Sequence, residues 1–265
     1  MARNESSGVA LGIAAEEIAA AFLLRPKLAI EWFEALGIRV VWDWRADVTR
    51  AQDLAFTVRK IADMDVLAAM RESVRAAIAD GITQREFRAR VASDLNRLGW
   101  YGPRTVTGPA GQVETVDLSA PHRLNTIFRT NAQGAYNAGR YLDQIKEADF
   151  APFWQYVAVM DERTRPAHAA MNGKVYRFDD PIWRTIYPPN GFNCRCRVRT
   201  YTQSQLDRKG LRVSSSVRDP GEPGFPDPGF DYNPGLVNAQ DAALGKVAAR
   251  ARERAEQAAS GGAVA

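Results

Sequence analysis

Apolar residues in the first hundred positions recur three and four apart, which is the spacing of one face of an α-helix. Leu54, Val58 and Ile61 follow this pattern. Thr83 and Glu86 form a capping box ahead of another apolar stripe. We therefore expect a helical module over residues 1–100, with helices at residues 16–24, 26–37, 50–61, 65–81 and 83–98.

The pattern changes after Trp100. Glycines and prolines are scattered through residues 101–120, and the remaining positions are polar apart from isolated valines. We expect a loop or linker there, with a small hairpin around residues 109–112 as the alternative. This segment is the best candidate for a domain boundary.

A compact α+β core is expected over residues 121–203, because one long amphipathic pattern is followed by short alternating runs. The expected elements are a helix over residues 121–145, strands over residues 153–159, 175–178 and 194–201, and a short helix over residues 166–172 that carries His168.

The proline- and glycine-rich composition of the last part of the chain, residues 204–265, predicts an extended arm. A short helix to Gly210 precedes a proline- and glycine-rich tract at residues 219–235, which should lie along a surface. A final helix over residues 239–257 and a disordered tail are expected after it. The fold class is thus α+β, with a helical N-terminal module, a small mixed core with short antiparallel strands, and an extended C-terminal arm.

Composition indicates a soluble protein, with 46% hydrophobic and 25% charged residues. The apolar run at residues 19–24 is far shorter than the roughly 20 residues that span a bilayer, so no membrane partner is expected. The two cysteines cannot build a disulfide framework, which favours a reducing compartment.

Positive charge is concentrated in one segment. Residues 161–200 hold eight basic and four acidic residues, which leaves 27 of each sign elsewhere in the chain. Arg195, Arg197 and Arg199 would share one face of an extended strand. Such a row can contact phosphates, pair with an acidic partner surface, or simply face solvent.

Both cysteines fall on the opposite face of that strand. Cys194 and Cys196 can be small buried residues, or they can hold a structural zinc ion together with His168 and Asp161. A regular strand places the two side chains too far apart for one tetrahedral ion, so a shared metal requires a kink at Arg195. Asp161 and His168 can also be interpreted as a general-base pair for hydrolysis, although structural duties such as capping a turn are commoner.

These motifs closely resemble the phage Mu F-like family of head morphogenesis proteins. The resemblance is carried by the run from Asp161 to His168, by Gly173 and by residues 187–197, which read YPPNGFNCRCR. Upstream segments and the closing GFDYNPG at residues 229–235 extend the resemblance to residues 20–236.

The resemblance implies a minor head protein of a tailed phage, a prophage or a phage-derived particle, located in the capsid interior or at the portal vertex and assembled in the host cytoplasm. It implies the portal protein and the major capsid or scaffolding protein as partners, with double-stranded DNA as a further candidate. No catalytic residue, enzymatic activity or certain cofactor comes with it. A metal-dependent hydrolase or nuclease that uses Asp161, His168 and a cysteine-bound zinc is the alternative. The residues expected to contact partners or DNA are Arg163, Arg177, Arg195, Arg197 and Arg199.

Overall fold

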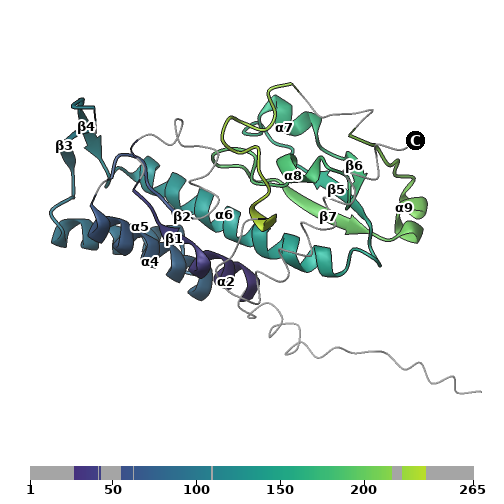
Figure 1. The fold of residues 1–265 in the computed structure, drawn as a ribbon, viewed down its shortest axis with the longest axis horizontal. Coiled ribbons are helices and arrows are strands. Elements are labelled where there is room, and N and C mark those ends of the chain that lie inside the picture. Colours follow the sequence, from purple (N-terminus) through teal and green to yellow (C-terminus); the bar gives the residue numbers. More distant parts are fainter. Residues whose placement is uncertain are drawn as a thin grey trace, which may run out of the picture.

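The computed structural model describes residues 27–40, 42, 55–61, 63–108, 110–216 and 223–236. The helices expected at residues 16–24 and 239–257 lie outside the described residues. The fold is mixed α+β and is built on helix α6 (Pro121–Lys146), which runs along the long axis of the molecule (Figure 1). Helices α4 (Met64–Asp80) and α5 (Gln84–Arg97) lie beside its first half, and a three-stranded sheet lies beside its second half (Figure 1).

The N-terminal helices are α2 (Lys27–Ala35), α4 (Met64–Asp80) and α5 (Gln84–Arg97). Local signals set the ends of α4 and α5, as the sequence predicts. The Asp63 side chain accepts backbone N–H groups at the start of α4, and Gly81 ends α4 in the left-handed conformation at φ 66°. Thr83 and Glu86 form the expected capping box of α5.

The prediction of a helix over residues 50–61 is wrong for residues 55–61, the part that the structure describes. Ala55–Phe56 forms strand β2, which pairs in parallel with β1 (Gly37–Ile38). Phe56 and Val58 are buried two residues apart, as in a strand, and Lys60 then takes φ 63°. A right-handed helix cannot contain that conformation, so the helical spacing of the apolar residues was misleading.

Residues 101–120 form a hairpin and not a loop. Strands β3 (Pro103–Thr107) and β4 (Val113–Asp117) pair antiparallel along their whole length. Most of their side chains are exposed or half-exposed, so the segment lacks the apolar alternation that identifies a strand with one buried face. The hairpin alternative is confirmed, with longer strands than expected.

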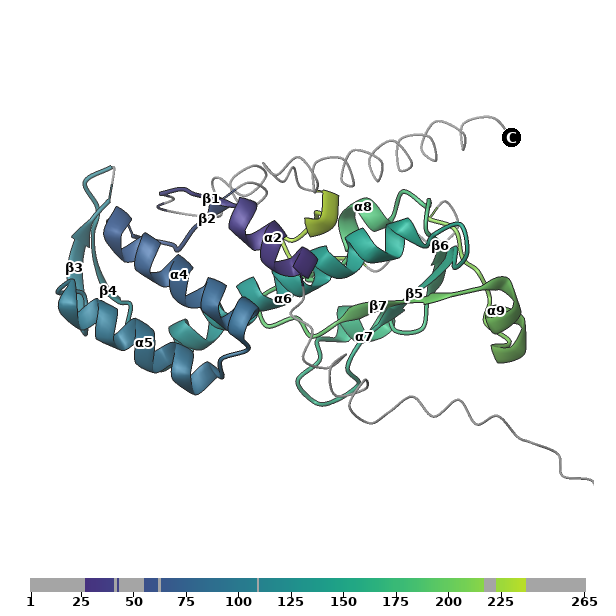
Figure 2. The same ribbon diagram turned by 90° about the horizontal axis from the view of Figure 1, so that it is seen from below.

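The second half of α6 supports an antiparallel sheet with the order β6-β5-β7. Its strands are β5 (Phe153–Val157), β6 (Val175–Arg177) and β7 (Arg197–Tyr201), with helices α7 (Pro166–Ala170), α8 (Trp183–Ile186) and α9 (Gln203–Lys209) around them (Figure 2). On α6, Gln133 donates to the Cys196 carbonyl and Gln144 to the Val198 carbonyl. These side chains tie the sheet edge at β7 to α6 and satisfy carbonyls that an edge strand would leave unpaired.

The strand expected at residues 194–201 begins later, at Arg197. Asn193 has φ 57°, and residues 194–196 have no regular secondary structure. The predicted alternation of faces therefore does not extend to the two cysteines, because it applies only to extended strand backbone.

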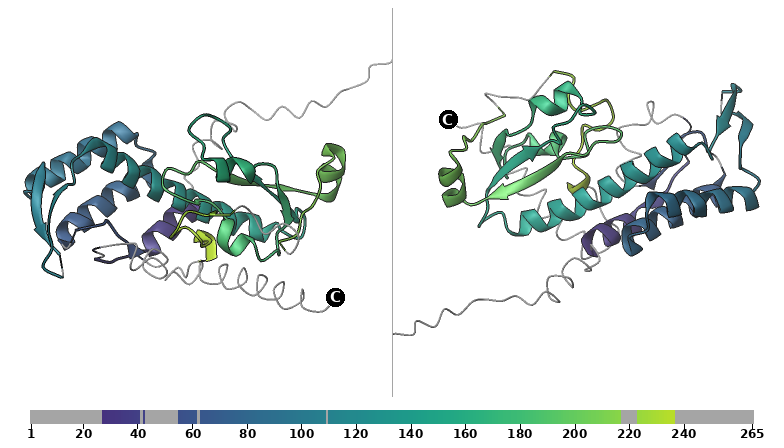
Figure 3. Two further views of the ribbon diagram at one scale, coloured as in Figure 1. Left: turned by 90° about the horizontal axis from the view of Figure 1, so that it is seen from above. Right: turned by 180° about the vertical axis from the view of Figure 1, so that it is seen from behind.

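One continuous cluster of buried side chains runs from Ala29 in α2 through α6 to Val198 in β7. The proline- and glycine-rich tract packs against this core through Phe225, and its residues Phe230 and Asn233 are buried as well. Trp32 donates its indole N–H to the Pro234 carbonyl, at the start of the short 3₁₀ helix η1 (Pro234–Leu236). Figure 3 shows this segment lying against α6. We call residues 223–236 the C-terminal strap.

In the part of the chain that the structure describes, no helix combines the length and the apolar character needed to cross a membrane.

Candidate metal centre and partner-binding surfaces

His168, Cys194 and Cys196 converge in the interior and are all buried. The imidazole Nδ1 lies 3.8 Å from the Cys194 sulfur and 3.6 Å from the Cys196 sulfur. One ligand atom from each residue lies within 4.8 Å of the other two. The structure thus brings together three of the four predicted metal ligands.

The members of the cluster come from a short helix and from an irregular segment, and not from the strands of the sheet. His168 lies in α7, the single short helix that follows the turn after β5 and begins at Pro166. Both cysteines lie in the irregular segment that follows Asn193. Because that backbone is not extended, the strand-spacing objection to a shared ion does not apply.

The two thiols differ in acidity because one donates a hydrogen bond to the other. The hydrogen bond from Cys196 holds the pKa of Cys194 well below its ordinary value, and the His168 side chain and the backbone N–H groups of Asn190 and Cys196 act in the same direction. The same interaction raises the pKa of Cys196, and burial raises it further. Cys194 is therefore the member of the pair that exists more readily as a thiolate, the form that binds metals.

The opposite edge of the imidazole faces a guanidinium and a carboxylate. Arg165 donates its Nε–H to His168 Nε2 over 3.1 Å and pairs with Asp227 over 2.7 Å. Asp227 Oδ1 lies 3.8 Å from the same Nε2. A Cβ at Gly191 would collide with both side chains of this ion pair, so only glycine allows the loop to approach them.

The C-terminal strap supplies this carboxylate and also covers the imidazole. Phe225 packs edge-on against His168 with ring centroids 5.0 Å apart, and against Tyr156 at 5.7 Å. Sequence reasoning assigned no role to Phe225 or Asp227. A single carboxylate within a proline- and glycine-rich tract carries no local signal for a contact with His168, which lies 59 positions earlier in the chain.

Asp161 lies outside the cluster. Its carboxylate accepts the Arg163 backbone N–H and two hydrogen bonds from Arg195, one of them 2.7 Å long. The hydrogen bond from Arg195 holds the pKa of Asp161 below its ordinary value. Asp161 therefore closes a turn and fixes Arg195, which is one of the structural duties that the sequence allows.

The predicted arginines fall into two groups. Strand register places Arg177 opposite Phe153, Arg199 opposite Gln155 and Arg197 opposite Val157, so these three arginines share the outer face of the sheet. Arg195 is held by Asp161 in the neighbouring loop, and Arg163 lies beside it. Within the described residues, Arg197 and Arg199 are exposed and form no ion pair, whereas Arg177 pairs with Asp179.

Two pockets flank the segment that contains Phe192, which contributes to both. The smaller, of about 240 Å³, adjoins the His168 cluster and is lined by Arg163, Arg165 and Arg195. The larger, of about 380 Å³, lies between α2, β2 and the first half of α6.

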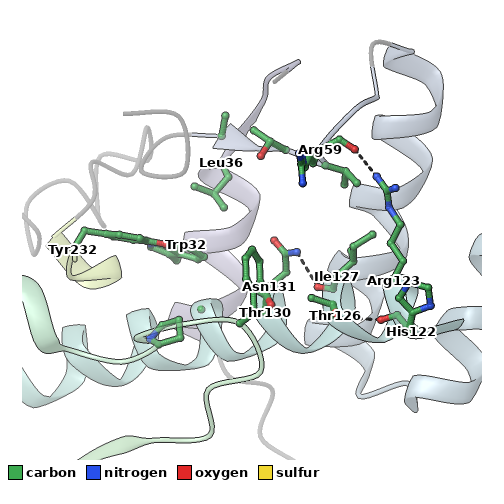
Figure 4. Close-up of a pocket in the computed structure, with 16 residues that line it drawn as sticks. Trp32, Leu36, Arg59, His122, Arg123, Thr126, Ile127, Thr130, Asn131 and Tyr232 are labelled. Carbon is green, nitrogen blue, oxygen red and sulfur yellow. Dashed lines mark hydrogen bonds between the residues drawn. The ribbon is translucent and has the colours of Figure 1, made fainter. Parts of the chain in front are cut away.

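The larger pocket has a basic and an aromatic end, and none of the described residues that line it is acidic (Figure 4). Arg123 and His122 lie at one end, and Trp32 and Tyr232 at the other (Figure 4). Arg123 donates to the Arg59 carbonyl, and burial, together with the charge of Arg59, lowers its pKa. Such a pocket suits a group that is part apolar and part anionic.

The donor set of the cluster provides three of the four ligands of a tetrahedral zinc ion. Zinc binds thiolates at about 2.3 Å and imidazole nitrogen at about 2.0 Å, so two such ligands on a tetrahedral ion lie about 3.5 Å apart. The observed Nδ1-to-sulfur distances of 3.6 and 3.8 Å are close to this value. The three residues that would hold the ion are His168, Cys194 and Cys196.

Comparison with known proteins gives one family and a small set of relatives. Residues 68–199 match the family described as Phage Mu protein F like protein. The chain is 44% identical over 198 residues to the putative capsid assembly protein F of Escherichia phage Mu, covering 75% of this chain and 45% of that protein. It is 42% identical over 179 residues to the Mu-like prophage FluMu F protein of Haemophilus influenzae, covering 68% of this chain and 42% of that protein. The chain thus spans less than half of the length of these curated relatives. No solved structure matches the chain with significance.

Proposed function

We propose that the chain, which belongs through residues 68–199 to the Phage Mu protein F like family, works in assembling the head of a tailed phage, a prophage or a phage-derived particle. The observation that carries this proposal is the 44% identity over 75% of the chain to a protein named as a putative capsid assembly protein. Identity of that level along most of a chain supports a shared role, and the cluster and the arginines lie within the residues that match the family. The proposed role is that of a minor head protein and not of an enzyme.

The proposed partners are the portal protein and the major capsid or scaffolding protein, with the chain located in the capsid interior or at the portal vertex. Two surfaces support this proposal. Arg197 and Arg199 offer exposed charge, with no ion-pair partner among the described residues, on the outer face of the sheet, and the larger pocket offers an apolar cleft beside Arg123. Both surfaces suit an acidic segment of another head protein, since opposite charge steers and orients protein association.

Double-stranded DNA is the second candidate for the outer face. A net charge of +4 over 265 residues is low for a dedicated DNA-binding protein, whose affinity comes mainly from phosphate contacts. Protein docking is therefore the preferred role of Arg197 and Arg199.

A double variant, Arg197→Ala with Arg199→Ala, separates these roles. Arg195 stays unchanged because Asp161 holds it. The matched control is Arg85→Ala with Arg90→Ala, which removes the same charge from exposed positions on α5. Docking predicts that co-purification with co-expressed portal protein falls in the first variant only.

Other outcomes redirect or reject the proposal. Unchanged portal association with weaker DNA binding would indicate that the outer face binds DNA. The slope of log affinity against log salt concentration should then be reduced by about 0.9 for each lost phosphate contact. No change in either measurement would mean that the outer face is only solvated surface.

A structural zinc site at His168, Cys194 and Cys196 is a second proposal, supported by the ligand-like distances in the cluster. Zinc would tie α7 to the irregular segment before β7. A hydrolase that uses Asp161 has less support, because the Asp161 carboxylate is engaged by Arg195 and by the Arg163 backbone. Elemental analysis of the purified protein tests the zinc site: about one zinc per chain is expected, and none after both cysteines are replaced by serine. A protein that is purified without zinc and binds none on addition would reject it.

A further inference from the structure

The hydrogen bond between Arg165 and His168 identifies which imidazole nitrogen carries the proton. An arginine N–H donates and cannot accept, so His168 Nε2, 3.1 Å from Arg165 Nε, must be the unprotonated nitrogen. The proton of the neutral ring then lies on Nδ1, which faces the two sulfurs. In the arrangement described, the imidazole donates toward the cysteines.

This tautomer cannot ligate a metal through the nitrogen that faces the sulfurs. A ligand nitrogen needs its lone pair free, so Nδ1 must lose its proton and a neutral ring must carry it on Nε2. Arg165 has no atom that can accept a hydrogen bond from Nε2–H. The contact that holds the ring in the present arrangement therefore opposes the metal-bound one.

Asp227 is placed to accept that proton. Its Oδ1 lies 3.8 Å from Nε2, on the edge of the ring away from both sulfurs, and its other oxygen is 2.7 Å from Arg165. A small movement of Arg165 would leave the carboxylate as the hydrogen-bond partner of the ring. Asp227 is held near the site by its own backbone, whose N–H donates to the Asn190 carbonyl over 3.1 Å.

We propose that Asp227 is the positioning residue of the metal centre: it accepts a hydrogen bond from His168 Nε2–H when Nδ1 binds the ion, and Arg165 holds the ring in the competing tautomer when the ion is absent. Metal-ligating histidines usually donate their second N–H to such a carboxylate, whose loss typically costs 10- to 100-fold in metal affinity. The inference rests on the proposed zinc site and adds a role for the C-terminal strap, which completes the site from a distant part of the chain.

Two variants distinguish this role from that of an ordinary ion pair. Asp227→Ala and Arg165→Met remove the same Arg165–Asp227 pair, but only the first removes the acceptor for Nε2–H. Zinc affinity, measured by competition with a chromophoric chelator, should fall 10- to 100-fold in Asp227→Ala. It should stay equal or rise in Arg165→Met, since the competing donor is gone. Asp227→Asn keeps an acceptor oxygen and should lie between the wild type and Asp227→Ala.

Equal losses of affinity in Asp227→Ala and Arg165→Met would overturn the proposal, because they would show that the ion pair only supports the fold. An unchanged affinity in Asp227→Ala would overturn it as well. Thermal unfolding of the metal-free variants shows whether each one folds, and Asp227→Asn serves as the test if Asp227→Ala does not.

The imidazole nitrogens give a direct second readout. The chain has two histidines, so ¹⁵N NMR of the rings is assigned by replacing His122. The metal-free protein should show the proton on Nδ1 of His168, and the zinc-loaded protein should show it on Nε2. A protein that binds zinc with no proton on Nε2 refutes the role of Asp227 alone, whereas a protein that binds no zinc refutes the site together with it.

Discussion

Asp161 and Asp227 each pair with an arginine, Arg195 and Arg165 respectively, but their surroundings give them different roles. Asp161 is bound by Arg195 and by the backbone of its own turn. Asp227 reaches the imidazole from the C-terminal strap. The first carboxylate orders a surface turn, and the second is available to the buried cluster.

Replacing Asp161 by asparagine should lower stability near neutral pH and have little effect in acid. Arg195 holds the pKa of Asp161 in the folded protein below the ordinary 3.8. The stability that the ionised Asp161 contributes is therefore present above pH 3.8 and is lost as the pH falls toward the pKa of the folded protein. Chemical unfolding of wild type and Asp161→Asn at several pH values checks this. Glu162→Gln, at an exposed neighbouring position, is the matched control for replacing a surface carboxylate by an amide. A difference in the free energy of unfolding between wild type and Asp161→Asn that stays constant from neutral pH to below pH 3.8 would contradict a stabilising pair between Asp161 and Arg195.

Asn233 should be among the most sensitive polar positions of the strap. Its side chain donates to the Trp183 carbonyl and accepts the Gly235 N–H, each over 2.9 Å and in the interior. Asn233→Ala leaves both backbone groups unpaired, which should reduce the free energy of unfolding by about 1–3 kcal/mol. Asn96→Ala, at an exposed position in α5, should change it little. Comparable urea midpoints for the two variants would show that the strap is not anchored as described.

The residues of the candidate site were only partly predictable from the sequence. His168, Cys194 and Cys196 are uncommon residue types within one short segment, and that alone identified them. Whether they meet depends on the left-handed Asn193 and the irregular segment after it, for which residue spacing on a strand is no guide. Asp227 and Phe225 were missed because their contacts with His168 are set by the folded path of the strap.

Helix α6 connects the two halves of the fold, and its two buried glycines make different contacts. A Cβ at Gly139 would lie 2.8 Å from the Ala29 backbone nitrogen in α2, whereas one at Gly134 would meet, among the described residues, only Trp32 at 3.9 Å. Gly139 therefore allows α2 to approach closely, and Gly134 does not have that function.

Alanine at these two positions should have opposite effects. Gly134→Ala should stabilise the protein by up to about 1 kcal/mol, since alanine favours the helix and meets no clash. Gly139→Ala should destabilise it by about 1–3 kcal/mol, because backbone in α2 would have to move. Thermal melts followed by circular dichroism compare the two variants. Stabilisation by both would mean that α2 does not pack tightly on α6.

At the scale of elements, local signals were reliable and long-range pairing was not. The capping box of α5 and the helix that begins at Pro121 depend on neighbouring residues, and both are present. Strand β2 was mistaken for helix because its partner β1 lies 18 positions earlier and because Leu54, Val58 and Ile61 fit helical spacing over a short run. The hairpin β3–β4 was partly missed because it buries little apolar surface.

At the scale of the whole molecule, one buried cluster runs through the helical part, α6 and the sheet. The chain should therefore unfold as a single cooperative unit. Far-ultraviolet circular dichroism reports mainly the helices, and tryptophan fluorescence includes Trp154 in strand β5 of the sheet and Trp183 in helix α8. Their urea transitions should coincide. Separate midpoints would instead support independent domains on either side of residues 101–120.

The proposed role in head assembly is tested most directly by counting heads. The gene is inactivated in the phage or prophage that encodes the protein, and particles are counted by electron microscopy after induction, with and without the intact protein supplied in trans. The expected result is few or malformed heads without the protein, recovery when it is supplied, and its presence in purified particles. Heads of normal number and shape that lack the protein would contradict the proposed function.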